Sequence, residues 1–164
     1  MNFTIEAMQP SDWAAVERIY LEGIADGNAT FETESPGWEK WNRGHHAHSR
    51  LVAKENGRLV AWAAVSPVSS RRVYGGVAEV SIYVAASLRG KGIGRSVLAE
   101  LIRQSEQYGI WTLQAGIFPE NRASIALHKA CGFREVGVRE RIGQLGGRWR
   151  NTLLLERRSP FVGN

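Results

Sequence analysis

Residues 87–95, Ser-Leu-Arg-Gly-Lys-Gly-Ile-Gly-Arg, have the composition of a loop that binds a pyrophosphate. They follow an apolar, strand-like run and precede a segment with helical periodicity. The three glycines, at alternate positions, let the backbone approach a ligand closely and turn several N–H groups one way. The helix dipole and three basic side chains add positive charge. We therefore predict contacts to a phosphate-bearing ligand from Arg89, Gly90, Lys91, Gly92, Ile93, Gly94 and Arg95.

Other glycine-rich turns between a strand and a helix fit this loop less well. A Rossmann loop belongs to the first strand–helix unit and has an acidic residue about 20 positions later, whereas several predicted strands precede this loop. The P-loop of NTPases ends in Gly-Lys-Ser or Gly-Lys-Thr, whereas this loop ends in Gly-Ile-Gly-Arg-Ser. A tight turn without a ligand is the remaining alternative, and it is unfavourable because each glycine loses much backbone entropy on folding.

Hydrophobic periodicity predicts the elements that position the loop. Apolar or alternating runs predict strands at 3–7, from 51 to the Asn-Gly turn at 56–57, and at 59–65, 77–84, 111–118, 136–138 and 149–155. Three-and-four spacing predicts helices after Asp12, near Pro36, from 93 to 108 and from 121 to 130. This order predicts a single α/β domain (α+β) over 1–164, with helices around one central sheet.

Bulk composition narrows the classes of function. The net charge of +5 comes from residues spread along the chain, without a basic tail or a stripe of aromatic and basic residues. We therefore expect an anionic small ligand or a solvated surface, and no nucleic-acid partner. The one cysteine excludes an internal disulfide and a cysteine-based zinc site, which favours a cytoplasmic protein. No signal peptide and no membrane span of about 20 apolar residues is expected.

Three sequence blocks together resemble the GNAT superfamily of N-acetyltransferases. Residues 81–84 are similar to its cofactor-pairing strand, 89–94 to its Arg/Gln-x-x-Gly-x-Gly/Ala pyrophosphate signature, and 119–133 to its later asparagine-to-Gly-Phe block. The resemblance implies a mixed, mostly antiparallel sheet flanked by helices and acetyl-CoA as cosubstrate. It implies that the strand containing Ile82, Tyr83 and Val84 pairs with the pantetheine arm and supplies a backbone N–H to the thioester carbonyl. Asn121 then serves the cofactor arm as well as capping the following helix; a helix cap alone is the alternative.

A narrower resemblance covers nearly the whole chain. Residues 29–34, 79–84, 126–128 and 147–149 are similar to the phosphinothricin and methionine-sulfoximine N-acetyltransferases. It implies acetylation of the α-amine of a small amino-acid-like substrate and a homodimer. The loop 66–76 departs from the pattern, since relatives often carry Trp-Lys or Trp-Arg where this chain has Val-Ser-Ser. A protein N-terminal or lysine acetyltransferase and a non-catalytic acyl-CoA sensor are the alternative functions.

Acetyl transfer needs a neutral amine. At pH 7, deprotonation costs about 1.4 kcal/mol for an α-amine and roughly 4.6 kcal/mol for a lysine, so a weak base suffices for the former. Glu79, on an otherwise apolar strand beside the predicted cofactor stretch, is our candidate base, and the resemblance places a glutamate there. A surface carboxylate on an edge strand is the alternative interpretation.

His128 is the second catalytic candidate, because it lies where many GNAT enzymes carry a tyrosine that protonates the thiolate. An imidazole exchanges protons near pH 7 and could serve the sulfur or the amine. A histidine packed in the core is the alternative.

For substrate binding we predict Arg71 and Arg72 on a substrate carboxylate, with Tyr74 beside them and Phe31 shaping the pocket. A solvated loop and plain core packing are the respective alternatives.

The remaining reactive side chains predict no further chemistry. Cys131 lies at a helix end with nothing to activate its thiol, so we expect a buried small residue and direct attack by the amine. His45, His46 and His48 lack accompanying carboxylates or thiols at metal spacing, and no metal cofactor is predicted.

Overall fold

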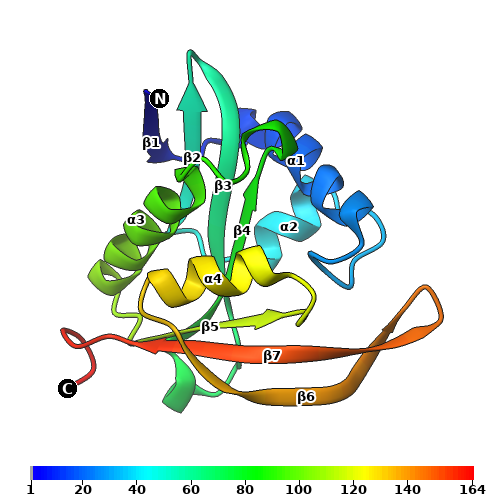
Figure 1. The fold of residues 1–164 in the computed structure, drawn as a ribbon. Helices are drawn as coiled ribbons and strands as arrows, with labels where there is room; N and C mark the ends of the chain where they lie inside the picture. The colour runs from blue at the N-terminus through cyan, green and yellow to red at the C-terminus, as the bar shows by residue number, and fades with distance from the viewer. Residues whose placement is uncertain (1) are drawn as a thin grey trace.

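The computed structural model describes residues 2–164 and has one twisted sheet in the order β1-β2-β3-β4-β5-β7-β6 (Figure 1). Neighbouring strands run antiparallel except β4 and β5, which are parallel. The strands are β1 (Phe3–Ala7), β2 (Arg50–Glu55), β3 (Arg58–Pro67), β4 (Val77–Val84), β5 (Thr112–Ile117), β6 (Arg134–Leu145) and β7 (Arg148–Arg158).

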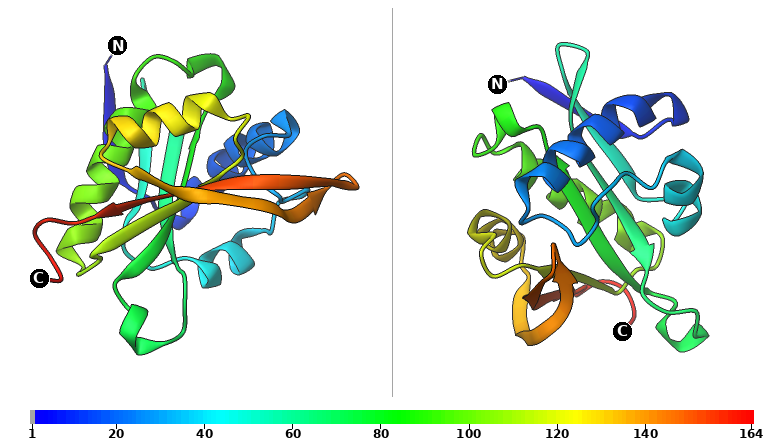
Figure 2. Two further views of the ribbon diagram at one scale, coloured as in Figure 1. Left: turned by 60° about the horizontal axis from the view of Figure 1, so that its bottom comes forward. Right: turned by 90° about the vertical axis from the view of Figure 1, so that its right-hand side faces the viewer.

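Helices cover both faces of the sheet. They are α1 (Trp13–Asp26), α2 (Trp38–Gly44), α3 (Ile93–Gln107) and α4 (Arg122–Ala130), with short 3-10 turns η1 (Pro10–Asp12), η2 (Arg72–Tyr74) and η3 (Ala86–Leu88). α1 and α2 lie on one face, and α3 and α4 on the other (Figures 1 and 2). None of these helices is long and apolar enough to cross a membrane within residues 2–164.

β3 is an interior strand of the sheet, and both of its faces are covered. Val60, Ala63 and Val65 pack into the core beneath α3, whereas Trp62 and Ala64 pack into a second core with α1 and α2. Burial on two faces explains why this strand is a continuous apolar run in the sequence instead of an alternating one.

The predicted order of elements is confirmed, and the main error concerns β6. The sequence predicted a short strand at 136–138, but β6 has 12 residues and forms a long hairpin with β7. β6 is the outermost strand, and Val136 and Val138 are 46% and 56% exposed. Neither face of β6 is buried, so its sequence does not alternate between apolar and polar residues.

Candidate active site

The site begins where β4 and β5 separate. The two strands pair only over three positions, from Val77↔Thr112 to Glu79↔Gln114. Beyond these pairs, β4 continues to Val84 and β5 to Ile117 without pairing with each other, and the two strands point apart in Figure 1. The separation opens a wedge in the middle of the sheet, and the walls of this wedge are unpaired strand backbone.

The backbone groups of β4 that lack a strand partner belong to alternate residues. Ala85 donates its N–H to Val60 of β3 at 2.8 Å. Antiparallel bonding alternates, so the N–H and C=O groups of Tyr83 also face β3, whereas those of Ile82 and Val84 face the wedge. An extended ligand arm can bond to such groups as a further strand would. The Tyr83 side chain, in turn, lines both cavities described below.

A cavity of about 420 Å³ runs from the wedge to the start of α3. Gly90 and Gly92 have φ of 77° and 85°, in the left-handed region that favours glycine. The first helical hydrogen bond of α3 runs from the Ser96 N–H to Gly92 O. The N–H groups of residues 93–95 therefore have no acceptor within the helix. Glycine-determined turns and free amides at a helix N-terminus fit an anionic phosphate, as the sequence predicted.

Two predicted residues of the loop have particular surroundings. The Arg89 guanidinium forms an ion pair with Asp26 at 2.6 Å, and its Nε donates to Val84 O at 3.3 Å. Arg89 therefore lines the cavity while also tying the loop to the end of α1. Lys91 is exposed and is not part of the cavity wall, so its contact with a ligand stays a prediction.

A Cβ at Gly94 would lie 3.3 Å from Leu127 Cδ2 and 3.5 Å from Val84 Cγ2. The missing side chain therefore lets α3 start close against α4 and β4, beside the wedge.

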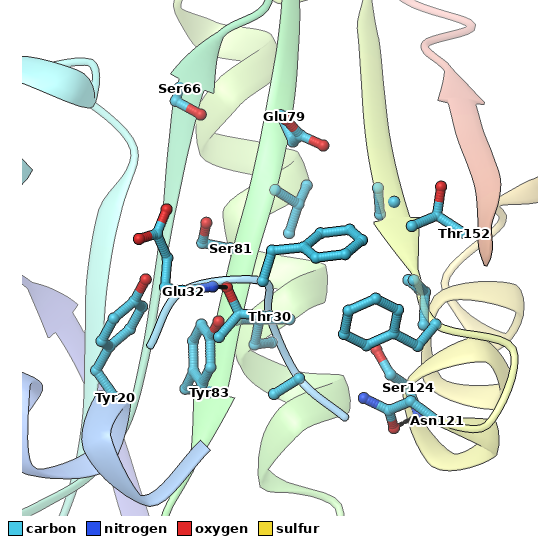
Figure 3. Close-up of a pocket in the computed structure, with 18 of the residues that line it drawn as sticks. Tyr20, Thr30, Glu32, Ser66, Glu79, Ser81, Tyr83, Asn121, Ser124 and Thr152 are labelled. Carbon is cyan, nitrogen blue, oxygen red and sulfur yellow. Dashed lines mark hydrogen bonds between the residues drawn. The ribbon is translucent and has the colours of Figure 1, made fainter. Parts of the chain in front are cut away.

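A second cavity of about 470 Å³, the acceptor cavity, joins the first along a shared wall that includes Ile82, Tyr83, Asn121 and Ser124. Figure 3 shows its polar side chains pointing inward from both sides of the wedge. Several of them were not predicted as site residues, because their spacing in the sequence also fits core or turn positions: Tyr20, Thr30, Ser66, Ser81, Ser124 and Thr152.

Glu79 lies at the point of separation and lines the acceptor cavity, as predicted for a base. The carboxylate is half-buried and accepts a hydrogen bond from the Gly116 N–H. Burial raises the pKa of Glu79, and the Gly116 N–H and the charge of Arg139 oppose this effect. The net rise makes its carboxylate a stronger proton acceptor than an exposed glutamate.

His128 is 2% exposed and packs edge-to-face against Phe133, with ring centroids 5.0 Å apart. Its Nδ1 lies 2.7 Å from Ser124 O, and its Nε2 is buried without a partner among the described residues. Burial lowers the pKa of His128 and favours the neutral ring. His128 is thus packed in the core and also lines the acceptor cavity, and its part in proton transfer stays a prediction.

Asn121 is the N-cap of α4, as predicted. Its Oδ1 accepts from Ser124 N–H at 3.2 Å, and its Nδ2 donates to Asn28 O at 3.1 Å. Asn121 lines both cavities. It therefore joins α4 to the loop after α1, and its contact with a cofactor arm stays a prediction.

The predicted substrate residues divide into two groups. Phe31 lines the acceptor cavity. Arg71, Arg72 and Tyr74 are exposed around η2, beyond the ends of β3 and β4, where the loop projects from the body (Figure 2). They line neither cavity, so their role in binding a carboxylate stays a prediction.

The cysteine and the three remaining histidines do not form a second reactive site among the described residues. Burial raises the pKa of the Cys131 thiol, which makes it a poor nucleophile. His45 stacks on Trp41 at 4.1 Å, and His46 stacks on His48 at 4.7 Å. Within residues 2–164, no group of three or more His, Cys, Asp or Glu side chains could hold a metal ion.

Comparison with known proteins identifies the family of this chain. Residues 12–133 match the model of the acetyltransferase (GNAT) family, and the chain belongs to that family. It is 34% identical to a phosphinothricin N-acetyltransferase of Alcaligenes faecalis, over 94% of this chain and 81% of the relative. It is 29% identical to an L-methionine sulfoximine/L-methionine sulfone acetyltransferase of Salmonella typhimurium, over 89% of this chain and 88% of the relative.

Solved structures agree. A phosphinothricin acetyltransferase of Sinorhizobium meliloti, crystallised in complex with acetyl-CoA, superposes with a TM-score of 0.86 at 30% identity. The match covers 96% of this chain and 89% of that chain. The protein is therefore an acetyltransferase of GNAT type with a single mixed sheet, as the sequence predicted.

Replacing Gly92 by valine should weaken coenzyme A binding at least tenfold in calorimetry. A β-branched residue at a φ of 85° is strained by at least about 1–2 kcal/mol and displaces the first amides of α3. Gly109→Val is the matched control, since Gly109 has a φ of 79° just after the other end of α3. Equal affinities for the two variants would contradict the predicted phosphate site.

Proposed function

We propose that this acetyltransferase moves the acetyl group of acetyl-CoA to the α-amine of a small amino-acid-like substrate of the phosphinothricin, methionine sulfoximine or methionine sulfone type. The observation that carries the proposal is the wedge between β4 and β5, which leads from the phosphate loop to a cavity containing Glu79. The names of the relatives support the substrate class. A cytoplasmic location, favoured by the single cysteine, is part of the proposal.

The residues present fit acetyl-CoA as the cosubstrate. The N–H groups at 93–95 and the side chains of Arg89 and Arg95 would hold the pyrophosphate, because they line one end of the first cavity. The backbone of Ile82 and Val84 would pair with the pantetheine arm along the wedge. The thioester end would then reach the wall shared with the acceptor cavity, near Asn121.

The proposed reaction is direct transfer. Acetyl-CoA supplies an activated acyl carbon; the amine nitrogen forms a bond to that carbon, and the carbon–sulfur bond breaks. Glu79 accepts the proton that the amine loses, and the leaving thiolate takes up a proton from solvent or a cavity hydroxyl. A wedge-facing N–H of β4 stabilises the charge on the carbonyl oxygen. Since an α-amine loses its proton far more readily than a lysine, one half-buried carboxylate is sufficient.

A thiol-release assay with a panel of amines tests the proposal. We expect turnover with methionine sulfoximine, methionine sulfone or phosphinothricin, and little with peptides that carry a lysine or a free N-terminus. Turnover of the peptides alone would support a protein acetyltransferase. Binding of acetyl-CoA without thiol release by any amine would support an acyl-CoA sensor.

Glu79→Gln should lower kcat at pH 7 by about a hundredfold or more while the affinity for acetyl-CoA stays the same, because the base is lost and the cofactor wall is intact. Wild-type activity should fall as pH drops through the raised pKa of Glu79, at a higher pH than for an ordinary glutamate. The variant should recover as pH rises and the free amine deprotonates. Glu39→Gln on the exposed side of α2 is the control; a variant as active as this control at pH 7 would refute the assignment.

The same pH series on His128→Phe separates the two interpretations of His128. We expect unchanged midpoints and a loss in kcat below tenfold, because the Nδ1 is bonded to Ser124 O and the Nε2 is buried. A lost or displaced limb of the profile would instead assign proton transfer to His128.

A homodimer is also part of the proposal, on the basis of the family resemblance. The outermost strand, β6, has one sheet neighbour and exposes Val136, Val138 and Ile142. An edge strand with exposed apolar side chains is suited to association with another protein surface. Light scattering should give twice the mass of one chain, and Val138→Lys should shift it towards the monomer. A monomeric mass at high protein concentration would exclude the dimer.

A further inference from the structure

Phe31 enters the acceptor cavity from the loop between α1 and α2, and its ring lies directly on the β6–β7 hairpin. A Cβ at Gly143 of β6 would lie 3.0 Å from Phe31 Cε1 and 3.1 Å from Phe31 Cζ. Gly143 is not among the glycines with positive φ, so the backbone does not require glycine there. The missing side chain therefore makes room for the Phe31 ring.

A second aromatic ring supports Phe31 from the body of the protein. Phe118, which follows β5 and also lines the acceptor cavity, packs edge-to-face against Phe31 with centroids 4.8 Å apart and an interplanar angle of 76°. The guanidinium of Arg150 lies 4.0 Å from the centre of the Phe118 ring. Arg150 is the residue of β7 that pairs with Gly143, so one rung of the hairpin contacts both rings.

Arg150 also fixes the loop that carries Phe31. Its Nη1 donates to Gly27 O at 3.1 Å, and its Nη2 donates to Asn28 Oδ1 at 2.8 Å. Nη2 also reaches the Glu120 carboxylate at 3.2 Å. The side chain is only 17% exposed, so these bonds are partly shielded from water.

We propose that the β6–β7 hairpin positions Phe31 through Gly143 and Arg150, and thereby sets the width of the acceptor cavity and the size of amine that it takes. Gly143 and Arg150 are positioning residues. Gly143 lines neither cavity, so we expect the effect of its substitution to fall on the amine and not on acetyl-CoA. The inference rests on the proposed function for its kinetic readout and on the loop itself for a structural one.

The first experiment compares two glycine substitutions on the same strand. Gly143→Ala should raise KM for the amine at least tenfold, with kcat changed less and KM for acetyl-CoA within twofold, because the new methyl group displaces the Phe31 ring. Gly137→Ala is the matched control, since a Cβ there meets nothing within 4 Å. Equal amine KM values for the two variants would overturn the proposal.

A double substitution shows whether the effect passes through Phe31. If Gly143 acts only by making room for the ring, Gly143→Ala should change the amine KM of a Phe31→Ala protein by less than twofold. Phe31→Ala alone should widen the cavity and improve the relative kcat/KM of bulkier α-amines, such as phenylalanine over alanine. Full additivity of the two substitutions would contradict the proposed route.

Arg150 is tested independently of catalysis. Arg150→Gln should speed amide hydrogen exchange in residues 28–36 and leave exchange in α3 unchanged, with Arg150→Lys intermediate because it keeps the charge over Phe118. The control is Arg148→Gln, an exposed arginine of the same strand whose side chain has no hydrogen bond or ion pair to any described residue. Unchanged exchange in Arg150→Gln would overturn the proposed role of Arg150 in holding the loop that carries Phe31. Inactivity of the wild-type protein with every amine would instead overturn the proposed function.

Discussion

The pairing of β4 with β5 ends after three residue pairs, and the arrangement of the site depends on that short contact. A parallel pair normally continues until one strand ends, because an unpaired buried amide costs free energy comparable to a lost hydrogen bond. Here, both strands leave backbone groups without strand partners in the middle of a sheet. Such groups remain favourable only if water or a ligand satisfies them, so the fold itself provides the binding edge.

The helices next to the wedge and the residue at its vertex also shape the site. α3 starts close against β4 because Gly94 has no side chain, and this places its free amides at the open end of the wedge. α4 begins at Asn121, whose side chain caps the helix and holds the loop after α1 at the same time. Glu79 lies at the vertex of the wedge, where burial raises the pKa of its carboxyl group.

The sequence predicted the parts of this arrangement that local chemistry determines. The glycines at 90 and 92, the cap at Asn121 and the strand at 59–65 each follow from rules that involve a few neighbouring residues. Contacts between distant segments were not predictable in this way. Arg71 and Arg72 are near Glu79 in the sequence, but the loop carries them away from the cavity, whereas Arg150 contacts residues 27 and 28 across more than a hundred positions. The burial of His128 Nε2 depends on packing against Phe133, which spacing alone does not show.

The peripheral position of β6 has an evolutionary consequence. Among the described residues, neither buried cluster includes a side chain of β6, and most of the strand is exposed. Exchanges at such positions generally alter folding free energy by less than about 0.5 kcal/mol. Under the proposed role of Gly143, substitutions in β6 would change the acceptor cavity at little cost to folding, whereas β7 is constrained because it carries Leu153 and Leu155 of the core.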